Sequence, residues 1–67
     1  MRIRLIHKDG HLIQDRNANP IHFLRWGRKL NREFTELTLK IDCREKDVKL
    51  ISYELKDGDI VGIVDWL

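Results

Sequence analysis

Alternating hydrophobic and polar residues at the start of the chain predict a β-hairpin. Residues 2–5 alternate between arginine and aliphatic side chains, which is typical of a strand with one buried face. Asp9 and Gly10 follow, and Asp-Gly between two apolar runs favours a type I′ turn, which needs positive φ at both central residues. Residues 12–14 then form the returning strand. We therefore expect a hairpin over residues 1–15.

The next segment predicts one amphipathic helix. Asn19 is a suitable N-cap, and Pro20 is tolerated at the first helical position, so we expect a helix from Pro20 to about Asn31. Its apolar residues fall on one stripe and its basic residues on the other side. Gly27, in the middle, costs about 1 kcal/mol relative to Ala, and it favours close approach of the helix to a sheet.

The second half of the chain predicts strands. Leucine and isoleucine alternate with polar residues over 35–43, which indicates a strand with one face in water. Residues 48–51 predict a short strand or extended piece, and residues 56–59 a tight glycine turn. Residues 60–64 are almost continuously apolar, so we expect a central strand that is buried on both faces.

Together these elements predict the order β-β-α-β-(β)-β. Two N-terminal strands, one crossing helix and a terminal strand parallel to the first make a β-grasp (ubiquitin-like) roll. The fold class is thus α+β, with a mixed sheet packed on one helix. At 67 residues, the chain has room for a single domain over residues 1–67.

Composition narrows the class of protein. A chain of 67 residues is too short for a large enzyme fold, and 42% hydrophobic residues exclude an intrinsically disordered one. No apolar run approaches the ~18–20 residues of a membrane span, and no secretion signal precedes the first strand. The single cysteine, Cys43, cannot form an internal disulfide. We therefore expect a cytoplasmic protein with no membrane contact.

Basic residues are concentrated in one segment. Residues 16–32 contain five basic and no acidic side chains, although the net charge of the whole chain is only +2. On the predicted helix this cluster lies on the exposed face, where it can contact phosphate or an acidic protein, with Trp26 beside it to stack or anchor. The alternative is an ordinary solvated helix face. The candidate binding residues are Arg16, Arg25, Trp26, Arg28, Lys29 and Arg32.

Residue types that carry catalysis or bind metals are sparse. His7 and His11 flank the first turn, but two histidines are too few for a structural zinc site, and His22 and Cys43 lie on other elements. Cys43 has no evident base or oxyanion site beside it. We expect no catalytic residue, no metal site and no cofactor, and hence a protein that is not an enzyme.

Residues 50–64 contain a leucine, a Lys-Asp-Gly-Asp turn and an Ile-Val-Gly-Ile strand. This stretch resembles the C-terminal half of a TGS domain, the β-grasp module of threonyl-tRNA synthetase, certain GTPases and the stringent-response synthetase/hydrolases. More loosely, residues 8–10 resemble the family's hairpin turn and residues 20–23 its helix start. The family's Ile-His pair at the helix end falls here on Gly27 and Arg28. The resemblance implies a regulatory or ligand-binding accessory, commonly found near tRNA, and a possible parent multidomain protein.

Two functions follow as hypotheses. The first is a non-catalytic TGS-like regulatory module that binds RNA, or another polyanion, through the basic helix face. The second is a protein–protein adaptor, of a regulatory or phage-borne kind, that uses the helix or the open sheet face with Arg2, Arg4 and Lys40. A sulfur carrier, a third β-grasp class, needs a C-terminal Gly-Gly, whereas this sequence ends in Asp-Trp-Leu.

Overall fold

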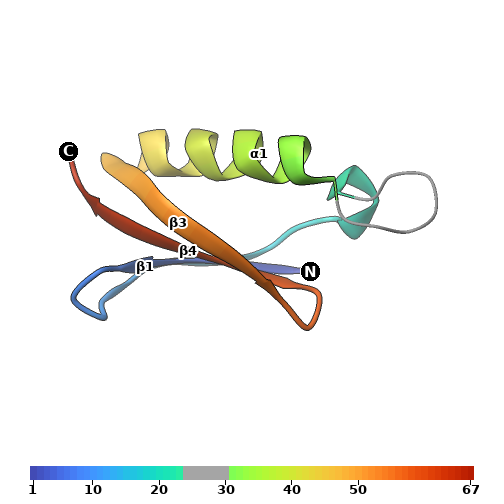
Figure 1. Ribbon diagram of the computed structural model, residues 1–67, viewed down its shortest axis with the longest axis horizontal. Helices are drawn as coiled ribbons and strands as arrows, with labels where there is room; N and C mark the ends of the chain where they lie inside the picture. Colours follow the sequence, from blue (N-terminus) through green and yellow to red (C-terminus); the bar gives the residue numbers. More distant parts are fainter. Residues whose placement is uncertain (24–30) are drawn as a thin grey trace.

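Four strands and one α-helix make up a two-layer fold (Figure 1). The computed structural model describes residues 1–23 and 31–67. The helix crosses one face of the sheet, and the other face is open (Figure 1). The elements are β1 (Arg2–His7), β2 (Leu12–Asn17), the 3₁₀ helix η1 (Pro20–Phe23), α1 (Arg32–Glu45), β3 (Val48–Lys56) and β4 (Asp59–Trp66).

The sheet has the strand order β2-β1-β4-β3. β1 and β4 are parallel, with Ile3 opposite Ile60, and the two outer pairs are antiparallel hairpins. The predicted pairing of the first strand with the last is therefore confirmed, as is the central position of the last strand. The expected burial of residues 60–64 on both faces is wrong, because Val61 and Ile63 lie on the open face of the sheet and are only half-buried. The fold class is also confirmed as α+β, with one helix on a mixed, β-grasp-like sheet.

The helix occupies a different part of the sequence from the one predicted. The helix expected from Pro20 to Asn31 is wrong at its start, because Pro20–Phe23 forms a 3₁₀ turn; residues 24–30 lie outside the described residues. The strand expected over residues 35–43 is also wrong, since this segment lies within α1.

Periodicity and capping explain why residues 32–45 are helical. The buried residues of α1 are Thr35, Leu39, Asp42 and Cys43, a spacing of three or four that belongs to one face of a helix. The Asn31 side chain caps the helix by accepting a hydrogen bond from the Phe34 backbone N–H at 3.2 Å. Alternation and helical spacing coexist in this segment, and the cap together with the absence of Gly and Pro favours the helix.

The two glycine turns differ in geometry. In the β3–β4 hairpin, Asp57 and Gly58 have φ of 52° and 81°, so both central residues are left-handed as a type I′ turn requires. In the first hairpin only Gly10 has positive φ, at 105°. The hairpin there is confirmed, but its loop is longer than a two-residue type I′ turn. The chain closes it with a hydrogen bond from the His7 N–H to the His11 carbonyl oxygen at 2.7 Å.

Strand β3 is longer than the sequence predicted. It spans nine residues in place of the short piece at 48–51, and its pairing with β4 shifts register between Leu50 and Ser52. The shift leaves Ile51 as an extra residue, a bulge on an outer strand of the sheet. A bulge interrupts the hydrophobic alternation, which is why the pattern predicted an early end.

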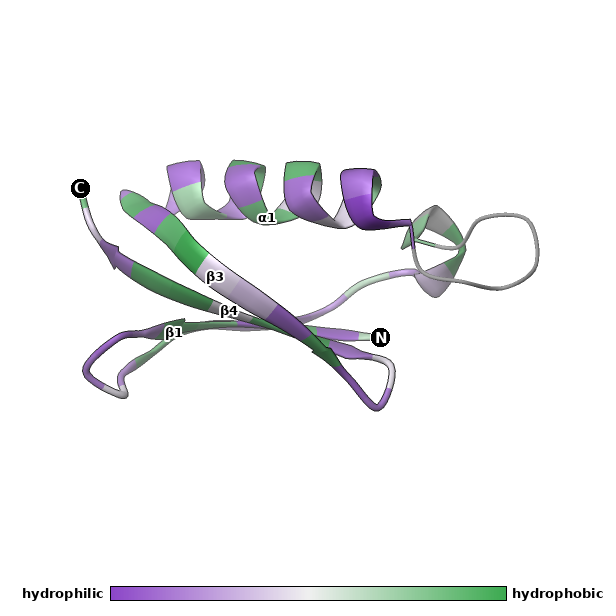
Figure 2. Ribbon diagram, in the orientation of Figure 1, coloured by the Kyte–Doolittle hydropathy of each residue, from purple (hydrophilic) through white to green (hydrophobic). Residues whose placement is uncertain are grey.

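The core lies between the sheet and the inner face of α1 (Figure 2). Gly62 lets the two layers meet, because a Cβ there would lie 3.0 Å from the Leu5 side chain and 3.6 Å from that of Leu39. The glycine that allows the helix and the sheet to approach closely is therefore Gly62 of the central strand β4. The fully buried aliphatic residues are Ile3, Leu5, Leu39, Ile60 and Val64.

Candidate functional site

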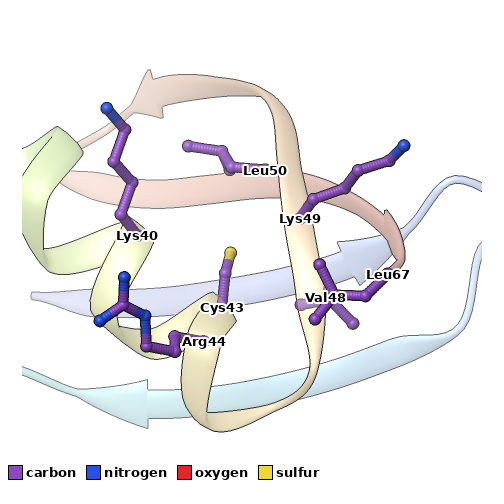
Figure 3. Close-up of a pocket in the computed structure, with 7 residues that line it drawn as sticks. All are labelled: Lys40, Cys43, Arg44, Val48, Lys49, Leu50 and Leu67. Atoms are coloured by element: carbon purple, nitrogen blue, oxygen red, sulfur yellow. The ribbon is translucent and has the colours of Figure 1, made fainter.

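An apolar groove opens between the last turns of α1 and the start of β3 (Figure 3). Its volume is about 300 Å³, at the lower end of the range of small ligand sites. Two elements that are adjacent in the chain form its sides, joined by the turn at residues 46–47. The lining residues are Lys40, Cys43, Arg44, Val48, Lys49, Leu50 and Leu67.

Local geometry brings apolar side chains to the floor of this groove. Cys43 lies on the buried face of α1, one helical turn after Leu39. Val48 and Leu50 are two residues apart in β3, so both side chains point to the face that carries the helix. Leu67 approaches from the end of β4, and its N–H donates to the Asp47 carbonyl oxygen at 3.4 Å.

Three cations surround this floor. Lys40 and Arg44 extend from adjacent turns of α1, and Lys49 extends from β3 (Figure 3). None of the three forms a salt bridge with a residue in the described ranges 1–23 and 31–67. The groove therefore combines an apolar surface with uncompensated positive charge. We call this arrangement the basic-rimmed groove.

Cys43 contributes its hydrophobic surface to the groove. Burial raises the pKa of its thiol, and the neighbouring Asp42 carboxylate raises that pKa further. The thiol is therefore neutral at physiological pH and a poor nucleophile.

The structure describes two of the six sequence-predicted site residues, Arg16 and Arg32. Arg16 of β2 points to the inner face of the sheet, where its Nε donates to Asp42 Oδ2 at 2.8 Å and its Nη2 to Asp42 Oδ1 at 3.2 Å. Gln14 donates to the same carboxylate at 2.8 Å. Arg16 thus ties β2 to α1. Four of the predicted residues, Arg25, Trp26, Arg28 and Lys29, lie outside the described residues.

Arg32, the sixth predicted residue, opens α1 at the end far from the groove. Its pKa is raised above its usual value by a hydrogen bond with Tyr53, by the charge of Tyr53 and by that of Glu36. The Tyr53 hydroxyl in turn donates to Glu36 at 2.8 Å. Arg32 and Arg16 are therefore each engaged by a different element, and the structure does not bring them together into one basic face.

The open face of the sheet carries paired charges. Arg2 forms a salt bridge with Asp15 at 2.8 Å, and Arg4 approaches Asp59 at 3.9 Å. Lys40, which the sequence placed on this face, lies on α1 because its segment is helical. The predicted trio of Arg2, Arg4 and Lys40 is thus divided between the two layers.

Of the two histidines beside the first turn, His7 packs into the fold and His11 is exposed. His7 is buried, its ring lies 5.1 Å from that of Trp66, and its Nδ1 accepts the Asp9 backbone N–H at 3.2 Å. The Nε2 atom of the same ring lies 3.3 Å from Asp65 Oδ1. Trp66 therefore packs back onto the sheet. Within residues 1–23 and 31–67, no group of three metal-ligating side chains is found.

The basic-rimmed groove was not predicted from the sequence, because the groove forms only when residues 35–43 are helical. A strand would place Lys40 and Arg44 on the same side as each other but away from the start of β3. One signal was present in the sequence: Leu39 and Cys43 are four residues apart and Val48 follows a short turn. That spacing is typical of a helix that packs on the next strand.

In the part of the chain that the structure describes, no helix has the length and apolar character needed to cross a membrane. Comparisons of the chain with protein-family models, with curated proteins and with solved structures found no match.

Proposed function

We propose that this protein is a non-catalytic interaction module that binds an acidic segment of a partner protein in the basic-rimmed groove. One observation carries the proposal: an apolar floor is surrounded by three cations that form no salt bridge with any described residue. This is the adaptor hypothesis of the sequence analysis, now assigned to a particular surface between α1 and β3.

The apolar floor of the groove and its three surrounding cations each favour a different feature in the partner. Burying apolar surface contributes about 25 cal/mol per Å², so an aliphatic or aromatic anchor on the floor supplies affinity. Lys40, Arg44 and Lys49 then select carboxylates on either side of that anchor and speed association. A peptide with an apolar residue between acidic residues meets both requirements.

The neighbouring strand supports an extended conformation for the bound segment. β3 pairs with β4 along one edge, and no other described strand pairs with its second edge. The backbone groups of that edge are available to an added strand, a common mode of peptide recognition. The bulge at Ile51 limits this edge to the portion beside the groove.

Direct titration of the protein with a labelled peptide tests the proposal. The probe is a capped peptide with a central pair of leucines flanked by glutamates, followed by fluorescence anisotropy at low salt. We expect saturable binding by the wild-type chain. The charge-reversed variant Lys40→Glu/Lys49→Glu should bind about tenfold more weakly or worse, because attraction becomes repulsion.

Lys56→Glu is the matched control for the single variant Lys49→Glu, since each reverses one lysine of β3 and the two positions are seven residues apart. Its dissociation constant for the probe should equal that of the wild type. A repeat of the titration in higher salt, where long-range attraction is screened, removes the effect of the change in net charge. Absence of saturable binding to the wild type, or equal losses in Lys56→Glu and in the groove variant, would refute the proposal.

RNA is the second candidate partner, and it is an alternative outcome of the same experiment. It is favoured by the free cations of the groove rim together with the basic residues at 25–29. Contact with about four phosphates predicts a log–log salt slope near −3 to −4. If an RNA hairpin binds with that slope, loses affinity in Arg25→Ala/Arg28→Ala, and the peptide does not bind, RNA replaces the protein partner.

The resemblance to the TGS domain belongs to the same proposal. It is supported by the β-grasp-like strand order and by the Asp57-Gly58 turn before the central strand. On this hypothesis the module is a regulatory accessory of a larger machinery, in the cytoplasm, where the free thiol of Cys43 stays reduced.

A further inference from the structure

The hydrogen-bond pattern of the sheet fixes which backbone groups of β3 face its unpaired edge. In an antiparallel pair, residues that exchange hydrogen bonds alternate with residues whose N–H and C=O point away from the partner strand. The Leu67 N–H donates to the Asp47 carbonyl oxygen at 3.4 Å. Val48 and Trp66, the next pair along, are therefore opposite each other without mutual hydrogen bonds. The N–H and C=O of Val48 thus point to the open edge of β3.

Leu50 faces the same edge, as its partner in β4 shows. Leu50 lies opposite Val64, whose carbonyl oxygen accepts the Lys8 N–H at 2.9 Å. The backbone of Val64 therefore points toward β1, and Leu50 receives no hydrogen bond from it. The bulge at Ile51 follows directly, so the regular run of edge-facing residues beside the groove consists of Val48 and Leu50.

The backbone of Val48 is covered but not bonded. This residue lines the groove and is 2% exposed, and its N–H and C=O have no hydrogen-bond partner among residues 1–23 and 31–67. A buried main-chain group without a partner is costly, and most such groups in native proteins are paired. An added strand supplies both the missing donor and the missing acceptor. The unpaired groups of Val48 therefore favour a main chain as the occupant of the groove.

The residues that face this edge also direct their side chains into the basic-rimmed groove. Val48 and Leu50 belong to its floor, and Lys49 and Leu50 extend to opposite sides of β3 (Figure 3). Side chains of directly opposite residues in a sheet lie on the same face. A residue of an added strand that lies opposite Val48 or Leu50 therefore points into the groove. The residue between them points to the other face, beside the Lys49 side chain.

We infer that the groove selects its partner by strand register, as a segment with an acidic residue between two apolar residues that is added as a strand beside residues 48–50. The inference rests on the proposed function and makes it specific. The two apolar side chains fill the floor, and the acidic side chain forms a cross-strand pair with Lys49. Lys40 and Arg44, on the α1 side of the groove, add to the attraction for an acidic segment.

Two peptides of equal composition test the register. The probe of the proposed function, with adjacent leucines among glutamates, is compared by fluorescence anisotropy with an isomer in which one glutamate separates the leucines. A strand directs only one of two adjacent leucines into the groove, so the alternating isomer should bind about fivefold more tightly or better. Lys49→Ala should weaken the binding of the alternating isomer about threefold, and the matched variant Lys56→Ala should not.

N-methylation of the alternating peptide tests the main-chain pairing. In an antiparallel arrangement the leucine N–H groups donate to Val48 and Leu50, whereas in a parallel arrangement the N–H of the central glutamate does so. We expect methylation of one of these two sets to weaken binding about tenfold and methylation of the other to have almost no effect. The sensitive set gives the direction of the bound strand.

Hydrogen exchange measured by NMR tests the same pairing on the protein. In the free chain the Leu50 amide should exchange faster than that of Lys49, which faces β4, and the alternating peptide should slow the Leu50 amide about tenfold or more. Equal affinities of the two isomers, equal losses from both N-methylations, or an unchanged Leu50 amide overturns the inference. If the adjacent-leucine probe still binds in those cases, the proposed function stands. If neither peptide binds, both are refuted.

Discussion

Individual side chains close the ends of the sheet. The best example is Asp9 in the first loop, whose Oδ1 accepts the His11 backbone N–H at 2.9 Å and lies 2.8 Å from His11 Nδ1. The backbone hydrogen bond from His11 is the main reason that the pKa of Asp9 falls from 3.8 to about 2. The Asp-Gly pair predicted the hairpin, but the partners of the carboxylate depend on the actual loop geometry.

The first prediction concerns pH and this loop. Because the pKa of Asp9 is lower in the folded protein, its stabilising effect is complete above about pH 4 and is lost as the pH falls toward 2. We expect amide shifts of the loop residues to titrate in that window, measured by NMR. In Asp9→Asn the titration should vanish; an unchanged transition would show that another group causes it.

The second prediction concerns the thiol of Cys43. Its side chain is buried and its pKa is raised by that burial, so alkylation of the native protein at neutral pH should be slow. We expect a rate at least about tenfold below that of the unfolded chain, measured by mass spectrometry with iodoacetamide. Equal rates in buffer and in denaturant would mean that α1 does not cover the thiol.

Between elements, contacts with α1 decide how the layers fit. Asp42, on the inner face of the helix, binds Gln14 and Arg16 of β2, although strand β2 is at the edge of the sheet. A sequence pattern that treats Asp42 as the polar face of a strand cannot reveal this link. The link joins side chains that are separated by 28 and by 26 positions in the chain, and these side chains meet only after the helix has packed on the sheet.

The third prediction tests that link. Asp42→Ala leaves Gln14 and Arg16 without their shared acceptor, and we expect a loss of about 2 kcal/mol in the free energy of unfolding, measured with urea. Asp15→Ala removes an exposed salt bridge with Arg2 and should cost less than about 1 kcal/mol. Similar losses for the two variants would contradict the structural role of Asp42.

The fourth prediction concerns the close approach of helix and sheet at Gly62. A valine there would crowd the Leu5, Leu39 and Leu50 side chains, since even a Cβ lies 3.0 to 3.6 Å from them. We expect Gly62→Val to destabilise the protein by about 1–3 kcal/mol in thermal or urea unfolding. A variant as stable as the wild type would mean that the layers have room to separate.

At the scale of the whole molecule, β1 and β4 join the two hairpins. They are the central strands, and their parallel pairing spans the full length of the sequence, from Ile3 opposite Ile60 to His7 opposite Val64. The basic-rimmed groove lies on the helix layer, and the open sheet face carries paired charges. Binding is therefore expected on the helix side.

The fifth prediction follows from this connectivity. Amides of β1 and β4 are protected on both sides by neighbouring strands, whereas β2 and β3 are edge strands. In NMR hydrogen exchange we expect the slowest amides in β1 and β4, at rates near those of global unfolding. If instead β3 exchanged most slowly, the central position of the parallel pair would be in doubt.

The sequence by itself determined the hairpins and the central strand. Turn chemistry at Gly10 and Gly58 is local, and the apolar run at 60–64 identifies the central strand, although only the face that carries the helix is fully buried. These features depend on backbone sterics and hydrophobicity, which act within a few residues.

Only the tertiary structure decided where the helix lies and which surfaces it creates. Residues 35–43 satisfy both alternating and helical spacing, so packing against Gly62 and the Asn31 cap had to select one. Because the segment is helical, Lys40 lies on α1 and not on the sheet. It faces Lys49 across the groove, which α1 and β3 form only together. A short ambiguous segment takes the conformation that buries the most apolar surface, and the free energy of that burial is a property of the assembled layers.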